Sequence, residues 1–278
     1  MTVLSNIFAC LVHEQLDCVA DLVRNLRCLD PDSMVVLYNG GTTLQQVELQ
    51  RLCDAMGAIL HPQSRPLAYG RVHDFALDCM RFISTNFAAD TLTIIDSDQL
   101  GLRPGYSHYL AHHLPTQGQV GLLTNAPMPQ LPTTAIGPAV TAWREFELWK
   151  PFLRRFPQGE MQFGRWTFWP ASVFTSEAAR CLVRFWDGDQ QLQAIVRRSK
   201  IFGTEEVILP LLVALLGFTI AANPCSYTYV KFRVRYTREQ LAAALAAPDA
   251  FWLHPVSRRY TDPVRAYIRA HFNEYGAD

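Results

Sequence analysis

Two aspartates one residue apart, Asp96 and Asp98, stand at the end of an apolar run that begins at Thr91. Such a run is typical of a buried strand, and side chains alternate along a strand, so both carboxylates should project to the same side. Two carboxylates held this close repel each other unless a cation lies between them. Mg²⁺ and Mn²⁺ prefer oxygen ligands and commonly share them with substrate phosphates. The pair therefore predicts a site for a metal ion and a diphosphate, as an enzyme that uses a sugar nucleotide would need.

The spacing alone is weak, because the Asp-x-Asp pattern also occurs at 30–32 and 187–189. The first of these contains a proline and follows a helical pattern, which indicates a turn. The second follows the predicted helix 178–186 and indicates a helix-ending loop. Only the pair at 96–98 ends an apolar, β-rich run. The alternative for this pair is a strand-end turn in which the aspartate side chains bond the backbone.

Composition excludes several classes of protein. The 278 residues carry no net charge, which argues against nucleic acid as a partner. The apolar stretch 207–220 contains Pro210 and Gly217 and is too short to cross a bilayer, so we expect no transmembrane segment. The seven cysteines form no Cys-x-x-Cys pair. We interpret them as reduced, buried thiols and expect a cytoplasmic, bacterial protein.

The first half of the chain alternates strands and helices, which predicts an α/β fold with a mixed, mainly parallel central sheet flanked by helices. We expect one domain over 1–278, with a nucleotide-sugar half at 1–125 and an acceptor half at 126–278. The expected strands are 7–13, 34–38, 58–61, 91–96, 120–124, 165–174 and 218–223. The expected helices are 16–29, 43–56, 71–87, 106–113, 143–156, 176–186, 190–199, 205–216, 241–245 and 262–272.

Four segments together resemble the GT-A glycosyltransferases, in which a DxD motif ends the fourth strand of a βα-repeated nucleotide-binding half. These segments are Thr91–Asp98, Phe163–Phe174, Gly203–Leu216 and His254–Arg258. Within this superfamily the chain is loosely similar to the branching β-N-acetylglucosaminyltransferases and peptide O-xylosyltransferases. Thr204–Ile208 and His254–Arg258 carry that closer likeness.

The resemblance implies a Rossmann-like fold and the transfer of a sugar from a nucleotide-diphospho donor, which we expect to be a UDP-sugar, with inversion. It implies that Asp96, Asp98 and His254 hold Mn²⁺ or Mg²⁺. It also implies that Glu206, the second acid of the pair, is the general base, and Glu205 could instead bind acceptor hydroxyls. The alternative for the two glutamates is charge complementarity at a helix start. The alternative for the histidine is an ordinary loop residue.

Further residues are candidates for contacts with the nucleotide. His13 and Asn39 end the first two strands, and ligands of open α/β sheets bind at the carboxyl ends of strands. Arg71 and Arg258 could pair with phosphates, and Ser97 lies between the two aspartates. Asn39 could equally be a turn former, since Asn-Gly is a strong turn signal, and Arg71 a surface residue.

Other functions remain open at the level of the sequence. A sugar-1-phosphate nucleotidyltransferase uses a similar fold, but the first strand here is not followed by a glycine-rich, basic loop. A phosphohydrolase would place its nucleophilic aspartate on the first strand. A non-catalytic carbohydrate- or nucleotide-binding relative would have the same sequence pattern. For an enzyme, the acceptor could be a glycan, a lipid-linked intermediate, a peptide or a small molecule.

Overall fold

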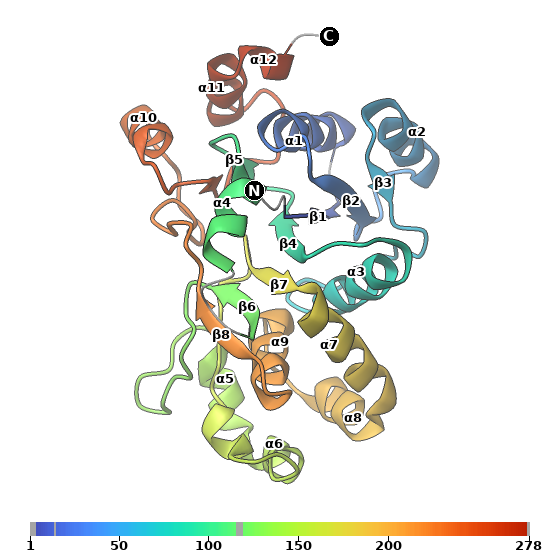
Figure 1. Ribbon diagram of the computed structural model, residues 1–278, viewed down its shortest axis with the longest axis vertical. Helices are drawn as coiled ribbons and strands as arrows, with labels where there is room; N and C mark the ends of the chain where they lie inside the picture. The colour runs from blue at the N-terminus through green and yellow to red at the C-terminus, as the bar shows by residue number, and fades with distance from the viewer. Residues whose placement is uncertain (1–3, 14, 115–118, 277–278) are drawn as a thin grey trace. The chain divides into compact units, whose positions relative to one another are not determined.

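The structure is a computed structural model that describes residues 4–13, 15–114 and 119–276. The chain divides into two compact units, each assembled from segments that are separate in the sequence (Figure 1). The first unit contains Met1–Pro66, Thr91–Pro115 and Pro224–Asp278. The second unit contains Leu67–Asp90 and Thr116–Asn223. The C-terminal segment thus belongs with the N-terminal strands.

Four parallel strands form the sheet of the first unit, in the order β3-β2-β1-β4. Their bounds are Asn6–Val12 for β1, Met34–Asn39 for β2, Ile59–Leu60 for β3 and Thr91–Asp96 for β4. Every residue of the central strand β1 is buried, as expected for a parallel strand covered on both faces. The predicted parallel order of these strands is therefore confirmed.

The helices of the first unit follow from its apolar spacing. In α1 (Leu16–Leu29) the apolar residues recur at helical intervals, and Val19, Leu22, Val23 and Leu26 are all buried. This helix contacts α2 (Gln46–Met56) and the short strand β5 (Leu100–Gly101). The remaining elements are α4 (Tyr106–His113), α10 (Arg238–Ala246), β9 (Trp252–Leu253), α11 (Pro263–His271) and α12 (Asn273–Gly276).

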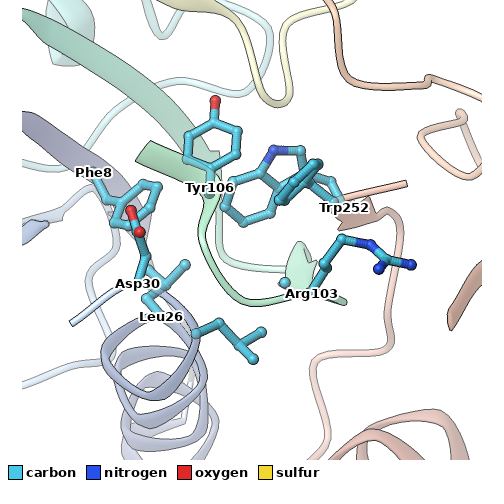
Figure 2. Close-up of a pocket in the computed structure, with 9 residues that line it drawn as sticks. Phe8, Leu26, Asp30, Arg103, Tyr106 and Trp252 are labelled. Atoms are coloured by element: carbon cyan, nitrogen blue, oxygen red, sulfur yellow. The ribbon is translucent and has the colours of Figure 1, made fainter. Parts of the chain in front are cut away.

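An aromatic cluster fills the space between β1, α4 and β9. Tyr106 lies 4.8 Å from Trp252 and 5.7 Å from Phe8, measured between ring centroids. Figure 2 shows these three rings around a small pocket that Asp30 and Arg103 also line. None of the candidate site residues lines this pocket, so it is part of the packing of the unit and not the site predicted from the sequence.

The second unit combines a three-stranded sheet with helices. Its strand order is β7-β6-β8, in which β6 (Val120–Thr124) runs antiparallel to β7 (Val173–Thr175) and parallel to β8 (Thr219–Ala222). The helix α7 (Ser176–Gly188) packs against both β6 and β7. The other helices are α3 (His73–Asn86), α5 (Pro138–Arg144), α6 (Phe146–Leu153), η2 (Gly159–Gln162), α8 (Gln190–Arg198) and α9 (Thr204–Leu215).

Several expectations about these elements are wrong. The expected strand 165–174 is reduced to β7, because its aromatic residues pack in a loop and not in a sheet: Trp169, for example, packs against Phe75 and Phe174. The expected helix 143–156 is interrupted at Glu145, so that its first two residues end α5 and most of the rest forms α6. Three helix starts also differ: α2 and α3 begin three and two residues later than predicted, and α10 begins three residues earlier.

No helix among the described residues combines the length and the apolar character needed to cross a membrane. The most apolar helix, α9, has only 12 residues and is almost entirely buried within its own unit.

Close packing around β6 yields a stability prediction. A Cβ atom at Gly121 would lie 2.6 Å from Cβ of Phe218 and 3.0 Å from Cβ of Ala178, closer than real side chains approach. We expect Gly121→Ala to lower the free energy of unfolding by about 1–3 kcal/mol, as measured by denaturant titration. Gly188→Ala is the matched control, because nothing lies within 4 Å of its added methyl group. Equal stabilities of the two variants would contradict the packing argument.

Candidate metal site

The tip of β4 is fixed by hydrogen bonds inside the sheet. Asn6 on β1 accepts bonds from the hydroxyls of Thr91 (3.0 Å) and Thr93 (2.8 Å), all three residues being buried. Leu11 pairs with Asp96 in the parallel register, so the strand ends where the first acidic residue begins the turn. The backbone N–H of Gln99 donates to the backbone carbonyl of Asp96 at 3.0 Å and closes that turn. The two aspartates therefore lie at the carboxyl end of the strands, in a position that the sheet and the turn fix.

A two-residue antiparallel ladder brings the end of the chain to this tip. Leu100 pairs with Leu253, so β5, which follows the aspartates, lies beside β9, which precedes His254. The amide of Val256 donates to the carbonyl of Asp98 at 2.7 Å and extends the contact beyond the ladder. Residues far apart in the sequence thus become neighbours through backbone pairing alone.

Three candidate ligands converge here. One ligand atom each from Asp96, Asp98 and His254 lies within 4.8 Å of the others. Nε2 of His254 is 3.2 Å from Oδ1 of Asp98 and 3.9 Å from Oδ2 of Asp96. Its other nitrogen, Nδ1, is 2.8 Å from the carbonyl oxygen of Lys231. That second contact fixes the ring so that Nε2 faces the carboxylates, the arrangement common among metal-ligating histidines.

The donor set fits a divalent cation. Oδ1 of Asp98 is buried and interacts with Nε2 of His254 at 3.2 Å. Two carboxylates and one imidazole are ligands that Mn²⁺ accepts, and imidazole suits Mn²⁺ better than Mg²⁺. Within the described residues, no other cluster of three such side chains is found.

The charges at this site are strongly coupled. Burial alone would raise the pKa of Asp98, but its interactions with His254 and Arg258 hold that pKa below its ordinary value. Burial alone would lower the pKa of His254, but Asp98 and Asp96 raise it above its ordinary value. The carboxylates thus favour the protonated imidazole, and the cationic imidazole helps to keep Asp98 ionised.

Arg258 supplies a second positive group. One guanidinium nitrogen lies 3.1 Å from Oδ2 of Asp98, and Nε donates to the hydroxyl of Ser97 at 2.9 Å. The Arg258 side chain is 40 % exposed, whereas Ser97 is buried. The guanidinium therefore rests on the acidic tip with part of its surface available to an anion.

Behind the tip lies a buried cluster that the sequence did not reveal. Arg265 donates to Asp21 (2.8 Å), to the carbonyl of Ser97 (3.0 Å) and to the carbonyl of Ser257 (2.7 Å). Arg269 donates to the other oxygen of Asp21 at 3.2 Å. The only signal in the sequence was two arginines four residues apart on a terminal helix, and that spacing does not name their partner.

Two predicted nucleotide contacts also lie at strand ends of the first unit. Val12 pairs with Asn39 at the ends of β1 and β2, and His13 follows directly. The side chain of Asn39 bonds its own loop, donating to the carbonyl of Leu44 and accepting from the amide of Gly41. His13 accepts from the hydroxyl of Thr43 through its carbonyl. The ends of both strands are thus organised by the 39–44 turn.

Arg71 belongs to the second unit, where it performs a packing role. Its guanidinium donates to the carbonyls of Val196 (2.7 Å) and Ser199 (3.2 Å) at the end of α8. Cations are favourable at helix C-termini, where carbonyls lack helical partners. These two carbonyls engage the Arg71 guanidinium in the structure, and its contact with a phosphate stays a prediction.

The adjacent acids at the start of α9 have different surroundings. Glu205 is buried and accepts from the amide of Val72 at 3.1 Å. Glu206 is half-buried, and its two oxygens accept from the indole of Trp166 (3.0 Å) and the amide of Trp169 (3.3 Å). Successive helix residues point about 100° apart, which separates the environments of the two carboxylates.

Comparison with solved structures identifies the fold. The chain matches the galactosyltransferase LgtC, solved with donor and acceptor sugar analogues, at a TM-score of 0.51 and 11 % identity, over 98 % of this chain and 97 % of that one. The chain has the GT-A fold. This confirms the fold that the alternation of strands and helices and the resemblance predicted. No protein-family profile and no curated protein sequence matches the chain.

Two further solved structures show weaker likeness. The bifunctional glycosyltransferase WbbM gives a TM-score of 0.48 and 10 % identity over 97 % of this chain and 52 % of that one. The chain therefore spans about half the length of WbbM. Mouse xyloside xylosyltransferase 1 gives a TM-score of 0.43 and 9 % identity over 81 % of this chain and 86 % of that one.

The raised pKa of His254 predicts how stability changes with pH in metal-free buffer. Its contribution is fully present below the ordinary histidine pKa of about 6.5 and is lost as pH rises through the raised folded value. The difference in melting temperature between the native protein and His254→Gln should therefore shrink above about pH 6.5.

Thermal unfolding followed across this pH range measures the effect. His108→Gln is the control, because that histidine is exposed and lies 3.8 Å from an exposed aspartate. A gap between native protein and His254→Gln that stays constant from acidic to alkaline pH would contradict the coupling.

Proposed function

We propose that this GT-A chain is a glycosyltransferase that moves a sugar from a nucleotide-diphospho donor to an acceptor hydroxyl with the help of a divalent cation. The convergence of Asp96, Asp98 and His254 supports the proposal most directly. Departure of a diphosphate develops negative charge, and this charge must be neutralised for the bond to the sugar to break. A cation bound there would supply Lewis-acid neutralisation of that charge.

The protein groups of the first unit have separate tasks in this proposal. Asp96, Asp98 and His254 would hold the cation, and Arg258, whose side chain is 40 % exposed, would contact a phosphate. Ser97 orients that arginine by accepting from its Nε. Mn²⁺ is the proposed ion because of the imidazole ligand. We propose UDP as the nucleotide carrier, with the strand ends at His13 and Asn39 as the contacts of its nucleoside.

Glu206 is the proposed general base. Transfer to a hydroxyl requires a group that takes the acceptor proton as the new bond forms. The donors from Trp166 and Trp169 hold the Glu206 carboxylate in one orientation. A base opposite the leaving group would invert the anomeric centre, the outcome that we propose.

Glu205 is a less suitable base than its neighbour. It is buried, and its oxygen Oε2 is engaged by the amide of Val72 and by the hydroxyl of Thr204 at 3.4 Å. That hydroxyl also lies 2.6 Å from Nδ1 of the buried His73. Glu205 thus fastens the start of α9 to the start of α3, and we propose that its role toward the acceptor is to support Glu206.

A thermal-shift screen of nucleotide sugars with and without Mn²⁺ tests the proposal, followed by an assay for released nucleoside diphosphate. A glycosyltransferase should show a metal-dependent rise in melting temperature with one donor, and release of the diphosphate when an acceptor is added. A melting shift without release would indicate a binding protein. Release of pyrophosphate from a nucleoside triphosphate and a sugar phosphate would indicate a nucleotidyltransferase.

Asp98→Asn should abolish metal-dependent donor binding while the protein still folds, because the neutral side chain is a poor metal ligand. We expect the donor dissociation constant measured with Mn²⁺ to rise at least about tenfold. Asp32→Asn is the matched control, since Asp32 lies in another Asp-x-Asp sequence of the same unit and is 63 % exposed. Unchanged Mn²⁺-dependent binding by Asp98→Asn would refute the metal role.

Glu206→Gln should keep donor binding and lose transfer, because an amide cannot accept the proton. We expect the transfer rate to fall by about 10²–10⁴-fold, with the melting shift caused by the donor retained. Glu177→Gln is the control, because Glu177 is also an acid in a first helical turn but is exposed. Full activity of Glu206→Gln would remove this residue from the role of base.

A further inference from the structure

Arg265 joins the two loops that carry every candidate metal ligand. One loop begins at Asp96, the last residue of β4, and contains Asp98, and the other follows β9 and contains His254. The Arg265 guanidinium donates to the carbonyl of Ser97 in the first loop and to the carbonyl of Ser257 in the second. Its remaining bond, at 2.8 Å, goes to Asp21 on α1.

Both members of this ion pair are completely buried. Arg265 and Asp21 have no exposed side-chain surface, a rare situation that costs free energy unless the charges are paired and hydrogen-bonded. Each of the three bonded nitrogens of Arg265 has a different acceptor, and both oxygens of Asp21 are used, the second by Arg269. The cluster is therefore satisfied, and its geometry is specific.

This geometry needs a guanidinium. Two main-chain carbonyls and one carboxylate in different directions match the planar fork of arginine, which presents five fixed donors. A lysine could pair with Asp21 as a point charge, but it could not hold both carbonyls in the same arrangement. A buried ion pair is by itself weak evidence for stability. The bonds of Arg265 to both carbonyls tie this pair to the two loops in particular.

We propose that Arg265, held by Asp21, is a positioning residue that sets the distance between the aspartate loop and the histidine loop and so preorganises the site for a divalent cation. The proposal rests on the proposed function, because it assumes that the three ligands bind a metal. Arg265 acts through the backbone at Ser97, between the two aspartates, and at Ser257, three residues after His254. Second-shell partners of this kind commonly change metal affinity by about 10–100-fold.

The test is the binding of Mn²⁺ alone, measured by the electron paramagnetic resonance signal of the free ion. Arg265→Lys preserves the charge opposite Asp21 and removes the fork. We expect its dissociation constant for Mn²⁺ to rise at least about tenfold at a temperature where circular dichroism shows the variant fully folded. Asp21→Asn, which leaves the arginine without its anchoring charge, should weaken binding in the same direction.

Arg155→Lys is the matched control. Arg155 pairs at 2.6 Å with Asp189, a carboxylate that is also buried, but this pair lies in the second unit and caps α8. The same substitution there should lower the melting temperature without changing the affinity for Mn²⁺. This control separates a general loss of stability from a change in the metal site.

Two failures can be told apart. If the native protein does not bind Mn²⁺, or if Asp98→Asn binds it as the native protein does, the proposed function fails and this inference fails with it. If the native protein binds Mn²⁺ and Asp98→Asn does not, then native-like affinity in folded Arg265→Lys overturns the positioning role alone. Failure of both Arg265→Lys and Asp21→Asn to fold would also overturn it, because the cluster would then be a requirement of the fold.

Discussion

Repulsion between Asp96 and Asp98 is the constraint on which the first unit depends. A sheet register fixed by Asn6 and a tight turn leave these carboxylates close together, and like charges this near need a cation. The protein supplies two of its own, from His254 and Arg258. One of them is a group that, once deprotonated, becomes a metal ligand. The arrangement without metal and the proposed arrangement with metal thus use the same side chains.

The sequence predicted the parts of this site that depend on local pattern. The run of apolar and β-branched residues before Asp96 predicts a strand. The parallel order of β1, β2 and β4 follows from the alternation of strands and helices along the chain. His254 was found only through a resemblance, since no local pattern ties it to the aspartates. Its place is decided by the β5–β9 ladder, whose two-residue strands are too short to show a period.

The sequence could not predict contacts between side chains that are far apart along the chain, because local spacing does not identify the partner. Asp21 occupies a helix whose apolar spacing is plain, yet nothing in that spacing says that its one buried carboxylate faces arginines near the end of the chain. The failure of the expected strand 165–174 has a similar origin. Its aromatic residues have strand propensity, but the indole N–H of Trp166 and the backbone N–H of Trp169 donate to the Glu206 carboxylate. Tertiary contacts at a candidate site therefore outweighed the strand propensity of this segment.

The order of the chain adds a constraint on how the site forms. The aspartates are reached a third of the way along the sequence, but the segment with His254, Arg258 and Arg265 returns to the same unit only after the second unit has been traversed. Until that return, the acidic tip lacks its compensating charges and the Ser97 carbonyl lacks its buried donor. Because an unpaired buried carboxylate is costly, we expect docking of the C-terminal segment to stabilise the acidic tip. The candidate ligand set is complete only after that segment has docked, because His254 follows β9, which pairs with β5.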